Sequence, residues 1–240
     1  MKTPESFVVV LCGMAFVMIA CAAINVAPVD GNRLLGFLIA GFLASTAKIR
    51  VLGLTGTYSL NFIVMLAASR ELPFAENLLL ATVCALSQSM VRALHRPLPI
   101  QIAFNVANLI LSSAGAVLVS QLLVELPKDW QLLRLIASGA VFYAINTGLT
   151  SMVLSLAQEG SIDELWKYWQ TSTIHFYLLG CTVAGTWSLL SPHVQGKSTL
   201  LFVGFLWWIQ PLLRAHMVSH PPFFRPVEAA EHEVPPPSHP

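Results

Sequence analysis

Uncharged hydrogen-bonding side chains recur at a regular spacing in one apolar stretch of this sequence. Gln101, Asn105, Asn108 and Ser112 are separated by four, three and four residues. In a helix, these intervals place all four side chains on one face. Amides offer both donors and acceptors of hydrogen bonds, so such a face could line a polar cavity that binds a small molecule. We therefore predict that Gln101, Asn105 and Asn108 bind a ligand.

A second polar stretch lies between two apolar ones, at residues 51–62. It contains Gly53 and Gly56, and its hydrogen-bonding side chains are Thr55, Thr57, Ser59 and Asn61. Irregular backbone is tolerated at membrane depth only where protein buries it or where it lines a wet cavity. One interpretation of residues 50–58 is a re-entrant loop, with Thr55, Thr57, Ser59 and Asn61 binding the same ligand. The other interpretation is a short cytoplasmic turn.

Hydrogen bonds between helices are the alternative role for these polar groups. In membrane proteins such bonds stabilise helix packing by about 0.6 kcal/mol each. Gln88, Asn146 and Thr150 lie inside other apolar stretches and could serve in the same way. The pattern leaves both roles open, although the grouping of amides on one face favours a shared cavity.

The residue patterns of enzymes and metal sites are missing from the sequence. It contains no HExxH, Walker or GxSxG motif and no paired carboxylates. Its four cysteines lie in apolar stretches without CxxC spacing, which is typical of small buried side chains: Cys12, Cys21, Cys84 and Cys181. We predict no catalytic residue and no metal site, and the sequence identifies no cofactor.

The composition indicates which elements must position these side chains. Apolar residues make up 55% of the chain and charged residues 10%, whereas soluble domains have about 25% charged residues. So few charges cannot coat a protein in water, and we therefore expect a lipid bilayer as its surroundings. The predicted fold class is all-α, a polytopic bundle of about six to eight transmembrane helices. The formal net charge of +1 gives no reason to expect nucleic-acid binding.

Apolar runs and the loop residues between them predict the individual helices. The first run follows Lys2 and is long enough to span a bilayer, so we interpret it as a retained helix rather than a signal peptide. A short amphipathic segment, 163–170, precedes the seventh helix. The predicted helices cover residues 6–27, 33–49, 59–70, 75–94, 100–124, 133–157, 172–190 and 199–215.

The ends of the chain complete the predicted organisation. Residues 1–215 form one transmembrane domain, and the proline-rich residues 216–240 form a disordered cytoplasmic tail. With the N-terminus inside, eight of the 13 lysines and arginines fall on the cytoplasmic side and five outside. This distribution agrees with the positive-inside rule, so we expect both termini in the cytoplasm.

The stretch from Lys48 to Phe62, KIRVLGLTGTYSLNF, resembles a membrane module found at the N-terminus of bacterial GGDEF and HD-GYP signalling proteins. The resemblance continues through Glu71-Leu72-Pro73, Glu76, Gln88, Arg96-Pro97 and the residues 101–107, QIAFNVA. It covers roughly residues 33–125. The resemblance implies a sensor in the bacterial inner membrane. No cyclase or phosphodiesterase domain follows in this sequence, so a partner protein would carry the output.

A fainter resemblance is to the substrate-binding subunits of energy-coupling-factor vitamin importers. Those proteins are also helical bundles, in which a loop resembling Lys48–Gly53 separates two helices. We therefore expect a non-enzymatic membrane protein that acts as a sensor-like or ligand-binding module, with a membrane or cytoplasmic partner and a small-molecule ligand. The alternatives are a vitamin-type importer subunit and a structural subunit of a larger membrane complex.

Overall fold

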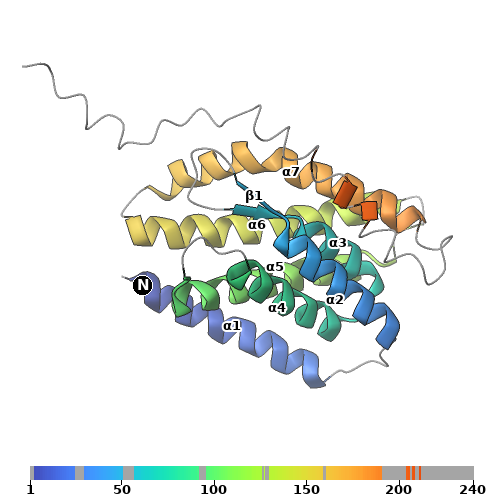
Figure 1. Ribbon diagram of the computed structural model, residues 1–240, viewed down its shortest axis with the longest axis horizontal. Helices are drawn as coiled ribbons and strands as arrows, with labels where there is room; N and C mark the ends of the chain where they lie inside the picture. Colours follow the sequence, from blue (N-terminus) through green and yellow to red (C-terminus); the bar gives the residue numbers. More distant parts are fainter. Residues whose placement is uncertain are drawn as a thin grey trace, which may run out of the picture.

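The computed structural model describes residues 3–24, 30–50, 57–91, 96–125, 127, 130–158, 161–190, 204, 205, 207, 208 and 211. Within these residues the chain forms seven helices and one two-stranded ribbon (Figure 1). The helices are α1 (Pro4–Ile24), α2 (Gly31–Thr46), α3 (Asn61–Glu71), α4 (Phe74–Met90), α5 (Pro99–Leu122), α6 (Gln131–Gln158) and α7 (Ile162–Leu190). The strands are β1 (Lys48–Arg50) and β2 (Thr57–Ser59). The predicted helical class is thus confirmed in its main feature.

Helix α3 lies at the centre of the bundle. Each of its residues from Asn61 to Ser69 is buried, and it contacts α2, α4, α5, α6 and α7. A helix that is buried on every side needs no polar face, which is why α3 is apolar all round apart from its ends. Helix α1 packs on α5, on the side of the bundle opposite α7 in Figure 1.

The ribbon joins α2 to α3 and adds two strands of three residues to a described structure that is otherwise all-helical. Strands β1 and β2 pair antiparallel, with Lys48 opposite Ser59 and Arg50 opposite Thr57. The prediction of an irregular loop near residues 50–58 differs from the structure at residues 50, 57 and 58, which belong to the two paired strands. Residues 51–56 lie outside the described residues, so the choice between a re-entrant loop and a turn stays open.

The side chain of Asn77 holds the opposite end of α3. Asn77, in the first turns of α4, donates from Nδ2 to the carbonyl oxygens of Ala68 (3.3 Å), Leu72 (2.8 Å) and Pro73 (3.1 Å). Ala68 O and Pro73 O also accept from the backbone N–H groups of Leu72 and Asn77, so Leu72 O is the carbonyl at the end of α3 that depends on the amide. Asn77 thereby locks the corner between α3 and α4.

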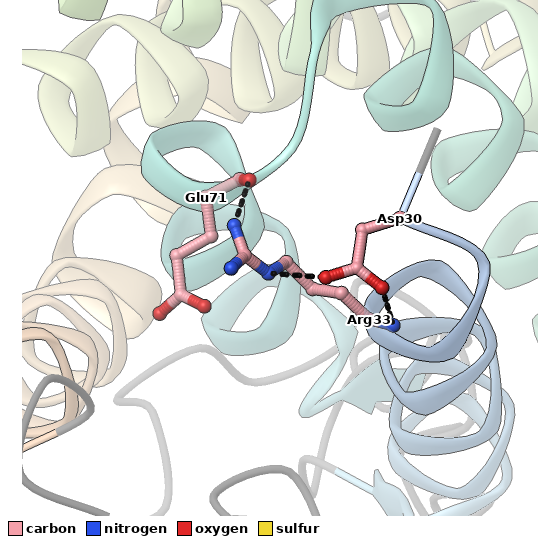
Figure 2. A network of polar contacts seen from close by, with 3 residues as sticks. All are labelled: Asp30, Arg33 and Glu71. Atoms are coloured by element: carbon pink, nitrogen blue, oxygen red, sulfur yellow. Dashed lines mark hydrogen bonds and ion pairs between the residues drawn. The ribbon is translucent and has the colours of Figure 1, made fainter. Parts of the chain in front are cut away.

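The start of α2 is tied to the same end of α3. Asp30 caps α2 by accepting a hydrogen bond from the backbone N–H of Arg33 at 3.2 Å. Arg33 lies 3.7 Å from the Asp30 carboxylate and donates to the carbonyl oxygen of Glu71 at 3.4 Å. Figure 2 shows the guanidinium between these two acceptors, with the Glu71 carboxylate pointing away.

Six predicted helices match α1 to α6, with ends that differ by at most four residues. The seventh prediction is wrong, because 162–190 forms one continuous helix rather than a segment at 163–170 followed by a helix at 172–190. The polar residues 170–173, where the two predicted segments meet, contain no glycine or proline, and Thr173 is buried inside the bundle. Of the eighth predicted helix, residues 204, 205, 207, 208 and 211 are helical. Its other residues and the tail 216–240 lie outside the described residues.

Three helices, α1, α5 and the Gln131–Ala157 part of α6, are long and apolar enough to cross a membrane. The outward face of α1 is apolar, with Val9 69% exposed and Phe16 71% exposed. Large exposed apolar patches are uncommon on monomeric proteins in water. The described structure is therefore consistent with a membrane protein.

Candidate functional site

A cavity of about 610 Å³ opens at the end of the bundle where α1 begins. Its wall is built from α1, the start of α3, the end of α4, the first half of α5, and α6 and α7. The volume falls within the range of about 300–1,000 Å³ that is usual for small-molecule sites. Five of the predicted ligand-binding residues line it: Ser59, Asn61, Gln101, Asn105 and Asn108.

The two remaining predicted residues are not placed against the cavity. Thr57 lies in β2, opposite Arg50, and its side chain lies outside the part of the chain that the structure describes. Thr55 lies in the segment 51–56, which is also outside it. Their predicted role in binding stays a prediction.

The side chains of Ser59, Asn61 and Gln88 form one wall of the cavity. Gln88 Oε1 accepts hydrogen bonds from Ser59 Oγ at 3.2 Å and from Asn61 Nδ2 at 2.8 Å. Ser59 and Asn61 are each only 5% exposed. Gln88 comes from the last turn of α4, so this cluster joins α4 to the end of the ribbon and the start of α3.

Asn105 faces the cavity from α5 with half of its amide in use. Its Nδ2 donates to Ser89 Oγ at 3.0 Å, and its Oδ1 has no hydrogen-bond partner among the described residues. Gln101, one turn earlier, is exposed at the mouth, and its Oε1 accepts from the backbone N–H of Leu98 at 3.0 Å. Asn105 therefore has a free acceptor, while Gln101 also caps the start of α5.

Asn108 is used chiefly by the protein itself. Its Nδ2 lies 2.8 Å from Asn146 Oδ1 and 3.3 Å from Thr150 Oγ1, both in α6. Its Oδ1 accepts from Ser112 Oγ at 3.4 Å. Asn146 in turn donates to the Tyr177 hydroxyl at 2.6 Å. This chain of hydrogen bonds joins α5, α6 and α7 in the wall of the cavity, so the structure gives Asn108 a packing role beside its predicted ligand-binding one.

Aromatic side chains complete the wall, and the polar pattern of the sequence did not predict them. Phe62, Phe104, Phe142 and Tyr177 all line the cavity, and the ring centroids of Phe62 and Tyr177 are 4.5 Å apart. Gln88 was visible in the sequence as a polar residue inside an apolar helix. The phenylalanines carry no such signal, because an aromatic residue in an apolar run is most often simply part of the core.

The part of the cavity wall that the structure describes carries little charge. The described residues that line it include one carboxylate, Glu5, which is exposed in the first turn of α1, and no lysine, arginine or histidine. Lys48 stands opposite Ser59 in the ribbon, and burial lowers the pKa of its ammonium group. No group of three or more histidine, cysteine or acidic side chains among the described residues could hold a metal ion. Hydrogen bonding and ring contact are therefore the chemistry that this wall offers.

Comparisons with known proteins leave the site to be interpreted from its own geometry. No protein-family model, no curated protein and no solved structure matches this chain. The two resemblances seen in the sequence stay predictions.

Proposed function

We propose that this chain is a non-enzymatic integral membrane protein whose helical bundle binds a small molecule in the cavity between α1, α5 and α6. The bundle is polytopic, lies in the bacterial inner membrane and has both termini in the cytoplasm. It acts as a sensor-like module that passes the presence of its ligand to a partner protein.

The membrane part of the proposal is supported by the surface of the bundle. The apolar side chains that face outward on α1 continue on α4 and α6, where Leu79, Leu86 and Leu133 are exposed. Lipid is the solvent in which such faces are stable, because in water they would drive association. The membrane fraction of expressing cells should therefore retain the chain after carbonate washing, and only detergent should extract it. A chain that stays monodisperse in buffer without detergent would contradict this part.

The ligand-binding part rests on one observation: a cavity of about 610 Å³ whose wall holds amide groups with unused hydrogen-bonding atoms. If these amides served only to join helices, they would be expected to satisfy one another, as Asn108 and Asn146 do. Asn105 Oδ1 instead has no partner among the described residues, and Asn105 lines the cavity. A ligand that enters the cavity can supply that partner.

Native mass spectrometry of the full chain in mild detergent tests this part. We expect the purified protein to retain a small molecule, and Asn105→Leu to abolish retention while the thermal unfolding temperature stays near that of the wild type. Gln121→Leu is the matched control, because Gln121 is exposed at the other end of α5 and away from the cavity. If Asn105→Leu loses expression or thermal stability instead, Asn105 is a packing residue.

A structural subunit of a larger membrane complex is the second candidate function. It is favoured by the chain of hydrogen bonds from Asn108 through Asn146 to Tyr177, which stabilises helix packing without a ligand. The same mass spectra separate the two functions. Stable copurification with other membrane proteins and no bound small molecule would support the structural role.

A further inference from the structure

The unused polar atoms of the cavity wall include both a donor and an acceptor on neighbouring residues. Asn61 Nδ2 donates to Gln88 Oε1 at 2.8 Å, which leaves Asn61 Oδ1 and Gln88 Nε2 without partners among the described residues. Both residues line the cavity. A carboxamide NH₂ offers two hydrogens and its oxygen two lone pairs, so this pair can receive one acceptor and one donor from a ligand.

The presence of both kinds of atom does not depend on which way the two amides are turned. If both amides were rotated by half a turn, Gln88 Nε2 would donate to Asn61 Oδ1. Asn61 Nδ2 and Gln88 Oε1 would then be the atoms left for a ligand, still one donor and one acceptor. A second acceptor, Asn105 Oδ1, lies on the α5 side of the same cavity.

The rest of the wall restricts the charge and shape of the ligand. A charged ligand would leave water for a cavity in which the described wall has no basic side chain and only the exposed Glu5 as an acid, and an unpaired charge in such a place is costly. Three aromatic rings lie together on the wall. The centroid of the Tyr177 ring is 4.5 Å from that of Phe62 and 6.2 Å from that of Phe142. Aromatic faces favour stacked or edge-on contact with another flat ring.

From these features we infer that the cavity takes an uncharged, flat, nitrogen-containing ring with a lactam- or imide-type edge, in which an N–H stands beside a C=O. The N–H donates to Asn61 Oδ1, and the C=O accepts from Gln88 Nε2. The ring lies against Phe62 and Tyr177. This inference rests on the proposed function, because it names the class of molecule that the ligand-binding site selects.

Three small probes of similar size separate this class of ligand from flat rings that carry carbonyl groups but no N–H. Phthalimide is flat and bicyclic and presents an N–H between two carbonyl groups. N-methylphthalimide lacks the N–H, and naphthoquinone carries carbonyl groups with neither N–H nor methyl. A site built to pair with an N–H rejects analogues that lack it, because its acceptor is left unpaired. Equilibrium dialysis against the full chain in mild detergent should show phthalimide bound at least tenfold more tightly than either of the others.

Two variants assign the preference to individual residues. Asn61→Leu removes the acceptor, so the affinity for phthalimide should fall to that for N-methylphthalimide. Gln88→Met removes the donor for the carbonyl that all three probes carry, so all three affinities should fall while their ratio persists. The ratio is the informative quantity, because a general loosening of the fold weakens all probes alike. Thr82→Val is the control on α4, since Thr82 bonds only to Leu78 O of its own helix and does not line the cavity.

The outcomes distinguish the ligand class from the proposed function. Preference for phthalimide that Asn61→Leu removes supports both. Equal or tighter binding of naphthoquinone, or a ratio that neither Asn61→Leu nor Gln88→Met removes, overturns the lactam or imide class, while binding itself keeps the proposed function. A ratio that Gln88→Met removes and Asn61→Leu leaves unchanged assigns the acceptor to Gln88, as in the rotated pair of amides. If no probe binds and native mass spectra of the same sample show no retained small molecule, both fail together.

Discussion

The ring of Phe62 lies directly over Gly180, so that α3 and α7 meet there with no side chain on the α7 backbone between them. A Cβ added at Gly180 would overlap two atoms of the Phe62 ring and would lie 3.1 Å from Ile63 Cγ1. Phe62 and Ile63 are both buried in α3, and Phe62 lines the cavity. The close approach of α7 at this glycine therefore sets the position of one aromatic wall of the site.

Gly180→Ala should destabilise the bundle for this reason. Overpacking a well-packed core costs about 1–3 kcal/mol, and the displaced Phe62 should also weaken ligand retention in native mass spectra. Gly13→Ala is the matched control, since a Cβ at Gly13 meets nothing within 4 Å. Unfolding in detergent, followed by circular dichroism, should show the control as stable as the wild type or more so. Equal stability of the two variants would contradict the packing at Gly180.

Asn108→Leu should cost more stability than Asn105→Leu. Asn108 joins α5 to Asn146 and Thr150 of α6, whereas the amide of Asn105 bonds only to Ser89. Removing Asn108 takes away the partner of Asn146 Oδ1 at a half-buried position beside the cavity, and the loss of such a hydrogen bond costs about 1 kcal/mol. The double variant with Asn146→Leu should be less destabilised than the sum of the two single changes, because neither partner is then left alone. Additive effects would argue against the pair.

Asn77→Asp should weaken the corner between α3 and α4. The change replaces the NH₂ with an oxygen that cannot donate, so Leu72 O loses its partner at 2.8 Å, and one unpaired buried group costs about 1–3 kcal/mol. The oxygens of Ala68 and Pro73 keep their backbone N–H partners. Chemical unfolding in detergent measures the loss. Leu79→Ala serves as the control because Leu79 is exposed two residues later on α4. Similar stability of Asn77→Asp and the wild type would show that the amide does not hold the corner.

At the start of α2, the capping bond should matter more than the ion pair. Asp30→Ala removes the side-chain acceptor for Arg33 N–H, and loss of such a cap costs about 1 kcal/mol. Asp30→Asn should retain most of the stability, because asparagine also caps helices. Arg33→Gln should cost less than about 1 kcal/mol, since both charged side chains are more than half exposed. If the stability of the wild type depended strongly on salt concentration and that of Arg33→Gln did not, the ion pair would matter more than the capping bond.

Local patterns in the sequence predicted most of the helices and the polar face of α5. Gln101, Asn105 and Asn108 recur at helical intervals, and this periodicity follows from the chain itself whatever surrounds it. The ribbon escaped prediction because strands of three residues are too short to show a period. The break expected before residue 172 was wrong because buried neighbours allow a polar stretch to remain helical.

What the sequence by itself determined is which side chains share a face of one helix and that the whole chain is too apolar for a polar surface. Only the tertiary structure decided that Gln88 meets Asn61, 27 residues earlier, and that Asn108 bonds to Asn146 where both line the cavity. Such meetings depend on how far each helix is rotated and how closely it approaches its neighbour. Those quantities are set by the packing of many side chains together, including small ones such as Gly180, and not by the spacing along any one segment.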